Sequence, residues 1–249
     1  MAANPRVLVT TPNGRTGSAA VRELLRHDFP VRALVRKDDA RAARLRQAGA
    51  EVVVGSLYDW RALREAMRGV QRAYHCPPFD ARVLHGAMMV ALAAEEAGLE
   101  VVALMSGWNP HPTHPSLGQR EHWMANNLYR RLHGVDVIHI NPGLFAFPYL
   151  LGIPAVKHFG QLMLPFGEGR NAPPSNEDIG AVAAHALMKP APWIGRCLRP
   201  MGPELLSGDD IAQILGRVLE RPVSYRPVSP RFFSRVAKAS GFPTFSIAQ

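Results

Sequence analysis

The sequence predicts an α/β fold with a doubly wound parallel sheet and a small additional lobe at the C-terminal end. Apolar segments of strand length alternate with amphipathic segments of helix length through residue 141. The first strand runs directly into a turn that carries Gly14 and Gly17, and a helix follows at once. The 249 residues, of which 47% are hydrophobic, suffice for one large α/β domain with a small lobe.

Six segments rich in β-branched residues and bounded by Gly, Pro or Asp are expected to form the strands. They are residues 6–10, 31–35, 51–54, 70–76, 99–106 and 135–141. Right-handed crossovers place the carboxyl ends of such strands along one edge of the sheet. We therefore expect ligand chemistry at that edge.

Helices are expected between these strands. Residues 17–27 place apolar side chains on one face, and residues 83–97 are rich in Ala and Met. Asp39 and Asp59 stand where N-caps belong, and a glycine follows three helices, at positions 49, 69 and 98.

The alternation weakens after residue 143, which divides the chain into a first domain, 1–143, and a second lobe, 144–249. Within the lobe, residues 176–200 begin with a helix that we expect to pack back on the main sheet. Another helix begins at Ser207, and residues 222–228 form a last extended piece. Residues 242–249 look like the start of a further element.

The glycine turn is typical of a phosphate-binding loop. Its glycines let a ligand approach the backbone, and the N–H groups at the start of the helix attract an anion. The alternative is a turn with a purely structural role. The ligand contacts are expected from the residues of this turn: Thr10, Pro12, Asn13, Gly14, Arg15, Thr16 and Gly17.

The chain resembles the NmrA-like branch of the atypical short-chain dehydrogenase/reductases, which have an NAD(P)-binding Rossmann fold. That family opens with a strand and G-A-T-G-x-x-G, whose three glycines align with Thr11, Gly14 and Gly17. The resemblance continues in order along nearly the whole chain, through Val31–Arg36, Gly49–Asp59, Asn141–Phe145, Asp178–Ala183, Gly202–Leu206, Asp210–Ala212 and Arg221–Val223.

Two positions depart from the family pattern. Thr11-Pro12 replaces Gly-Ala, and a threonine in the left-handed region costs roughly 1–2 kcal/mol more than glycine. Either the turn differs or Thr11 has an ordinary φ. Ser56 replaces the acidic residue of the family's G-D-L, so Ser56 and Leu57 are expected to contact adenine.

The end of the second strand indicates which dinucleotide is preferred. NAD enzymes place a carboxylate there, whereas this chain has Arg36 and Lys37. A 2′-phosphate would gain charge-assisted hydrogen bonds of about 1.5–3 kcal/mol each. We therefore expect NADP(H), with NAD(H) second; the alternative is that Arg36 is only a surface charge. Asp38 and Asp39 are expected to start the next helix.

The resemblance implies that residues after the fourth and fifth strands line the nicotinamide. These are Cys76, Pro77, Pro78 and Phe79, followed by Ser106, Gly107 and Trp108. Ordinary loop packing explains this composition equally well.

The catalytic residues are the least determined part of the prediction. Short-chain dehydrogenases commonly use Tyr-x-x-x-Lys, and the chain contains no such motif. Where the family often keeps a lysine, the candidates are Arg120, which could hold the ribose, and His122, which would suit a general acid. The alternative for His122 is a histidine on the helix surface. His111 and His114 fit a surface loop better than a metal site.

Aromatic residues give the second lobe the character of an apolar substrate pocket, and ordinary core packing is the equal alternative. The expected substrate contacts are Trp108, Phe145 and Tyr149.

Composition excludes several other classes of protein. The net charge is +9, but no run of five basic residues occurs, so a solvated basic surface is expected rather than specific nucleic-acid binding. No apolar run reaches the roughly 18–20 residues of a membrane span, and no signal peptide precedes the first strand. The two cysteines, Cys76 and Cys197, fit a reducing cytoplasm and no structural metal.

These observations lead to an NADP(H)-binding oxidoreductase of the cytoplasm. Hydride would pass between the nicotinamide and a small apolar carbonyl, quinone or activated alkene. The alternative is a non-catalytic NAD(P)H sensor that acts through a partner protein. A homo-oligomer is also left open, and neither the substrate nor the direction of reaction follows from the sequence.

Overall fold

The computed structural model describes residues 4–78 and 80–239. The chain forms two compact units. Unit 1 comprises Met1–Pro142 and Asn176–Pro200, and unit 2 comprises Gly143–Ser175 and Met201–Gln249. The expected further element at residues 242–249 lies outside the described residues.

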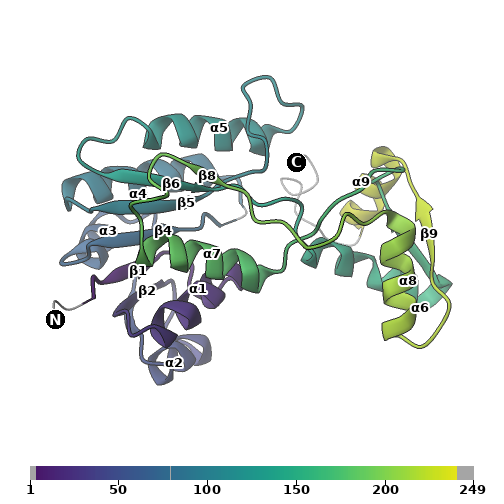
Figure 1. Cartoon of the computed structure of the whole chain (residues 1–249), viewed down its shortest axis with the longest axis horizontal. Helices are drawn as coiled ribbons and strands as arrows, with labels where there is room; N and C mark the ends of the chain where they lie inside the picture. Colours follow the sequence, from purple (N-terminus) through teal and green to yellow (C-terminus); the bar gives the residue numbers. More distant parts are fainter. Residues whose placement is uncertain (1–3, 79, 240–249) are drawn as a thin grey trace. The chain divides into compact units, whose positions relative to one another are not determined.

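Unit 1 is built on a seven-stranded parallel sheet of order β3-β2-β1-β4-β5-β6-β8 (Figure 1). The six expected strands are confirmed: two have the expected bounds, 31–35 and 51–54, and the other four are slightly shorter. The strands are β1 Val7–Val9, β2 Val31–Val35, β3 Glu51–Val54, β4 Arg72–His75, β5 Val101–Met105, β6 Asp136–Ile140 and β8 Cys197–Leu198. This order makes the fold a doubly wound, Rossmann-like α/β sheet, as the sequence predicts.

Helices cover both faces of the sheet. Figure 1 shows α1, α2 and α7 on one face and α3, α4 and α5 on the other. Their bounds are α1 Arg15–Arg26, α2 Ala40–Gln47, α3 Trp60–Met67, α4 Val83–Glu96, α5 Leu117–Tyr129 and α7 Asn176–Met188. The central strands are therefore shielded from water on both sides, which explains their continuous apolar sequences.

The expected caps and the glycines after the helices are confirmed, whereas the helix expected at 17–27 begins two residues earlier, at Arg15. The Asp39 side chain accepts from two backbone N–H groups at the start of α2, and Asp59 caps α3 in the same way. Gly49, Gly69 and Gly98 follow their helices with φ between 64° and 100°, a backbone conformation that glycine adopts without steric cost.

The segment 176–200 lies in unit 1. Helix α7 packs closely on α1, since a Cβ atom at Gly180 would lie 2.5 Å from the Ala19 Cβ. Strand β8 then adds to the sheet beside β6, with Cys197 opposite His139. The sequence predicts the return of this segment but not the two-residue strand.

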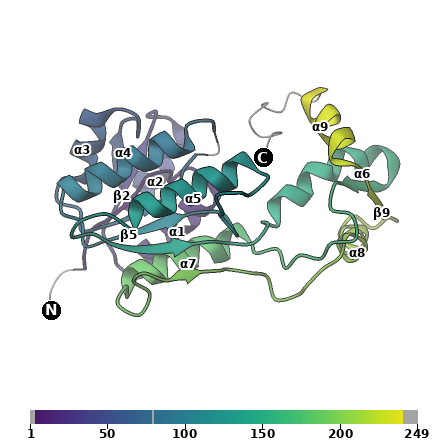
Figure 2. The same ribbon diagram turned by 90° about the horizontal axis from the view of Figure 1, so that it is seen from above.

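Unit 2 has its own small core. Its elements are the 3₁₀ helix η1 Phe147–Gly152, α6 Ile153–Phe159, β7 Gln161–Leu164, α8 Gly208–Val218, β9 Ser224–Pro227 and α9 Pro230–Ala239. Strands β7 and β9 pair in parallel, and Figure 2 shows α6, α8 and α9 grouped near β9. Ser207 caps α8 as expected, through a reciprocal capping box with Asp210.

Among the described residues, no helix combines the length and hydropathy that a bilayer-spanning segment requires.

Candidate functional site

The predicted site lies at the carboxyl edge of the sheet in unit 1. Strand β1 pairs with β2 on one side and with β4 on the other, so the order of winding reverses at this strand. Such a switch point leaves a crevice outside the carboxyl ends of the strands, which is where open α/β sheets bind their ligands.

The glycine turn follows β1 and begins α1 in a tightly packed conformation. Only Asp28 and Glu220 have a positive φ among the described non-glycine residues, so Thr11 has an ordinary φ. The Gly14 N–H donates to the Thr11 carbonyl at 3.0 Å. A Cβ atom at Gly17 would lie only 2.0 Å from the same carbonyl oxygen, so the first turn of α1 can approach the turn only because this residue is glycine.

Three threonine hydroxyls tie the glycine turn to the end of β4. Thr10 Oγ1 shares a hydrogen bond of 3.1 Å with His75 Nδ1. Thr11 Oγ1 donates to the Cys76 carbonyl at 2.7 Å, and Thr16 Oγ1 lies 3.3 Å from Cys76 Sγ. The turn is therefore held in place before any ligand arrives, which reduces the entropy lost on binding.

The start of α1 is accessible to an anion. Its N-cap is Gly14, which has no side chain that could cap the first turn. Pro12 is buried, whereas Asn13, Gly14 and Arg15 are exposed. Backbone N–H groups at a helix start carry partial positive charge, so this end of α1 favours a pyrophosphate.

Arg36 and Lys37 follow β2 at the same edge, and both are exposed. No ion pair joins either of them to a carboxylate within the described ranges. The two acidic residues that come next are already engaged. Asp38 pairs with Arg46 at 2.7 Å, and Asp39 caps α2 and pairs with Arg41 at 2.6 Å. The positive charges of Arg36 and Lys37 are thus available to an anionic ligand.

The loop after β3 forms a turn around Ser56. The Ser56 hydroxyl accepts from the Tyr58 N–H at 3.2 Å. The side chain of Leu57 is buried in the core, so Leu57 would contact a ligand through its backbone.

Sequence reasoning missed a charged aromatic cluster beside this loop. The Tyr58 hydroxyl donates to Asp80 at 3.2 Å, and the Arg82 guanidinium lies 3.8 Å from the Tyr58 ring centroid. Burial, with the Asp80 charge, raises the pKa of Tyr58 to about 12, so its hydroxyl stays protonated. In the sequence, the one indication of this cluster is that Tyr58 belongs to Gly49–Asp59, a segment that resembles the NmrA-like family.

Residues after β4 and β5 lie on the other side of the switch point. Cys76, Pro77 and Pro78 are half-buried, and burial raises the pKa of the Cys76 thiol. Ser106 is buried, and its Oγ has no hydrogen-bond partner among the described residues. Phe79 lies outside the described residues.

Gln119 is a second polar group at this position that sequence reasoning did not single out. A Cβ atom at Gly107 would lie 2.1 Å from Gln119 Oε1, and this buried oxygen has no partner in the described part of the chain. Together with Ser106 it offers unsatisfied polar atoms at the end of β5, a position where a ligand could satisfy them.

The two predicted catalytic residues lie on α5 in different environments. Arg120 is exposed, and its Nε donates to the His114 carbonyl at 2.5 Å, so it anchors the preceding loop. His122 is half-buried, and burial lowers its pKa to about 4. Its imidazole is therefore uncharged at neutral pH, which argues against a role as general acid there.

The predicted substrate residues are divided between the two units. Trp108 belongs to unit 1 and is 37% exposed, with the Arg199 guanidinium 5.1 Å from its ring. In unit 2, Phe145 is half-buried, whereas Tyr149 is buried. The ring centroids of Tyr149 and Phe166 are 5.4 Å apart, in an edge-to-face arrangement. The packing of Tyr149 matches the core alternative that the sequence left open.

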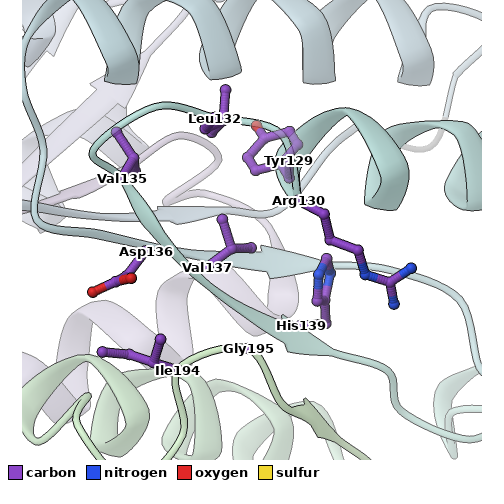
Figure 3. A pocket seen from close by; sticks show the side chains of 9 residues that line it. All are labelled: Tyr129, Arg130, Leu132, Val135, Asp136, Val137, His139, Ile194 and Gly195. Carbon is purple, nitrogen blue, oxygen red and sulfur yellow. The ribbon is translucent and has the colours of Figure 1, made fainter.

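A cavity of about 260 Å³ lies elsewhere in unit 1 (Figure 3). Its walls come from the end of α5, from β6 and from the loop before β8. None of the predicted site residues lines it. Asp136, at the amino end of β6, contributes to it, so it does not belong to the carboxyl edge.

The chain is similar in sequence or in fold to several known proteins. A curated NAD(P)H azoreductase from Xenophilus azovorans is 29% identical over 238 residues, which cover 95% of this chain and 82% of the relative. The structure of a quinone oxidoreductase from Escherichia coli complexed with NADPH matches with a TM-score of 0.86 at 23% identity, covering 97% of this chain and 85% of that one.

NmrA, a negative transcriptional regulator solved in complex with NADP, matches with a TM-score of 0.76 at 19% identity. That match covers 92% of this chain and 75% of the regulator. The family model of the NmrA-like family matches residues 3–125, which include the glycine turn, the first five strands and most of α5. Residues 3–125 of the chain therefore match the NmrA-like family, the family that the sequence resembles.

Proposed function

We propose that this protein is an NADP(H)-dependent reductase. Its substrate would be a small apolar molecule with a carbonyl, quinone or activated alkene group. The observation that carries the proposal is the glycine turn at the switch point, with an uncapped α1 beside two cationic residues whose charges are not neutralised. The azoreductase and the quinone oxidoreductase named above support this class of reaction.

The residues at the edge fit a dinucleotide. Gly17 allows α1 to approach the turn, so the N–H groups of its first turn would hold the pyrophosphate. Arg36 and Lys37 would hold the 2′-phosphate of NADP(H), since Arg46 and Arg41 offset the negative charges of Asp38 and Asp39.

The bound nicotinamide would supply the hydride. The protein's own part is to bind and orient: Ser106 and Gln119 present unsatisfied polar atoms at the end of β5, where the ring is expected. Arg120 carries a permanent positive charge near this end of α5 and could stabilise a developing oxyanion. With His122 neutral at pH 7, catalysis would rest on positioning, and the proton would come from solvent.

The second candidate is a regulator that senses the nucleotide. The absence of Tyr-x-x-x-Lys favours it, and so does the similarity to a transcriptional regulator. Both candidates share nucleotide binding and differ only in turnover.

The test has two stages. Titration with NADPH, followed by nicotinamide fluorescence, measures binding. NADPH oxidation is then followed with a panel of quinones, enones, aldehydes and azo dyes, using NADPH deuterated at C4 to detect hydride transfer. Turnover with an isotope effect is expected. Tight binding without turnover on any substrate favours the sensor, and no binding at all refutes both.

A further inference from the structure

Three potential metal ligands meet on the surface of unit 1, apart from the predicted nucleotide site. Glu23 lies on α1, and His27 is the C-cap residue one turn later; His185 comes from α7, 162 residues from Glu23 in the sequence. The Glu23 Oε1 atom lies 2.8 Å from His185 Nε2 and 3.3 Å from His27 Nε2. One ligand atom from each residue lies within 4.8 Å of the other two.

The separation of 3.3 Å between Glu23 and His27 fits a tetrahedral metal ion, whereas the 2.8 Å hydrogen bond between Glu23 and His185 would have to lengthen. With metal–ligand bonds of about 2.0–2.1 Å, tetrahedral ligands are roughly 3.3–3.4 Å apart. The Glu23 side chain is 15% exposed, whereas those of His27 and His185 are 39% and 55% exposed. The two rings are therefore open to solvent, which can supply a further ligand.

We propose that Glu23, His27 and His185 form a binding site for Zn²⁺, with water in the fourth position. Two imidazoles and one carboxylate are a ligand set that zinc uses in proteins. Sequence analysis led to the expectation of no metal because it considered the cysteines and their spacing. A site assembled from two distant helices leaves no such spacing in the sequence.

Arg26 is the internal competitor for this site. Its guanidinium donates to both oxygens of Glu23, at 2.6 Å to Oε1 and 3.1 Å to Oε2. A cation at Oε1 would have to displace the shorter of these bonds and would be repelled by the guanidinium. Removal of the Arg26 charge should therefore strengthen zinc binding.

Zinc at this position would join α7 to α1. These helices already pack closely at Gly180, so the bound ion would fasten the segment that returns to unit 1. Because an ion that binds only the folded state raises its stability, thermal unfolding of unit 1 should shift upward with zinc concentration.

The experiment uses tag-free full-length protein freed of metal with a chelator. The background carries Cys197→Ser, because that exposed thiol could bind zinc itself. Zinc affinity is measured by competition with a chromophoric chelator, and the unfolding temperature is followed in parallel. His185→Ala is the test variant, Arg26→Gln the variant of opposite sign, and His158→Ala, an exposed histidine of unit 2, the matched control.

We expect one zinc ion per chain. His185→Ala should weaken binding about tenfold or more, since even the loss of an outer-sphere partner costs metal sites that much. Arg26→Gln should tighten it, and His158→Ala should leave it unchanged. Absence of saturable binding overturns the proposal, as does equal affinity in His185→Ala. NADPH titration of the same samples separates this outcome from a failure of the proposed reductase function.

Discussion

Mild acid is expected to destabilise unit 1 through histidines whose pKa values are lowered by burial. His75 is completely buried on β4, and burial lowers its pKa to about 3. His139 on β6 is 1% exposed, and burial, with the nearby Arg130 charge, lowers its pKa to about 4. In the folded protein both imidazoles are therefore neutral at every pH above about 5.

The direction of the effect follows from proton uptake. In the unfolded chain a histidine has its ordinary pKa of about 6.5, so it binds a proton as the pH falls below that value. The folded state binds none until far lower pH, and stability is lost as the pH falls from about 6.5 toward 4. Between pH 7 and pH 5 each of these histidines should lower the free energy of unfolding by about 2 kcal/mol. The same holds for His122, whose pKa burial lowers to about 4, so the three together give about 6 kcal/mol.

Urea unfolding followed by tryptophan fluorescence measures this directly. All four tryptophans, at positions 60, 108, 123 and 193, lie in unit 1, which also contains the three histidines. His139→Gln should remove about a third of the difference between pH 7 and pH 5. His158→Gln in unit 2 should leave that difference unchanged.

His139→Gln can be less stable than the parent at every pH. The test therefore compares, within each protein, the free energies of unfolding at pH 7 and pH 5, so a uniform loss of stability cancels. Equal free energies of unfolding at pH 5 and pH 7 in the parent protein would refute the reasoning. An unchanged pH difference in His139→Gln would refute the part that concerns this residue.

Three further substitutions test the packing that supports the site. Gly17→Ala forces a Cβ atom against the Thr11 carbonyl, and should lower stability by about 1–3 kcal/mol and abolish NADPH binding by fluorescence titration. Gly180→Ala forces a Cβ atom against Ala19, and should cost about 1–3 kcal/mol by urea unfolding. Arg32→Met removes a buried guanidinium that donates to two carbonyls at the end of α3, and should cost about 1–3 kcal/mol in the same assay. Wild-type stability in any of them contradicts the contact described.

The fold could be predicted because its signals are local. β-branched strands, acidic N-caps such as Asp39 and glycines such as Gly98 each have a direct backbone cause, and together they fix the alternation of strand and helix. Strand β8 escaped prediction because two residues, Cys197 and Leu198, carry no periodicity. They form a strand only because β6 offers an unpaired edge.

The candidate site could be predicted only in part. The glycine turn and Arg36 lie beside strands in the sequence, so their position at the edge follows from the topology. The engagement of Asp38 by Arg46 could not be foreseen, nor could the stacking of Arg82 on Tyr58, because both depend on how side chains meet in space.

Burial likewise decides what a histidine can do. His122 has the residue type of a general acid, yet its surroundings lower its pKa to about 4. Desolvation depends on the packing of α5 on the rest of unit 1, which no motif near His122 reveals.

The most direct test of the central claim compares NADPH and NADH affinity in Arg36→Asp. Arg196→Asp is the control, because it makes the same charge change at an exposed residue that precedes the amino end of β8. Arg36→Asp should weaken NADPH binding by about tenfold to a hundredfold, and NADH binding by less than about threefold, because only NADPH carries the 2′-phosphate. Equal losses for the two nucleotides, or an equal loss in Arg196→Asp, would contradict the assignment of Arg36 to that phosphate.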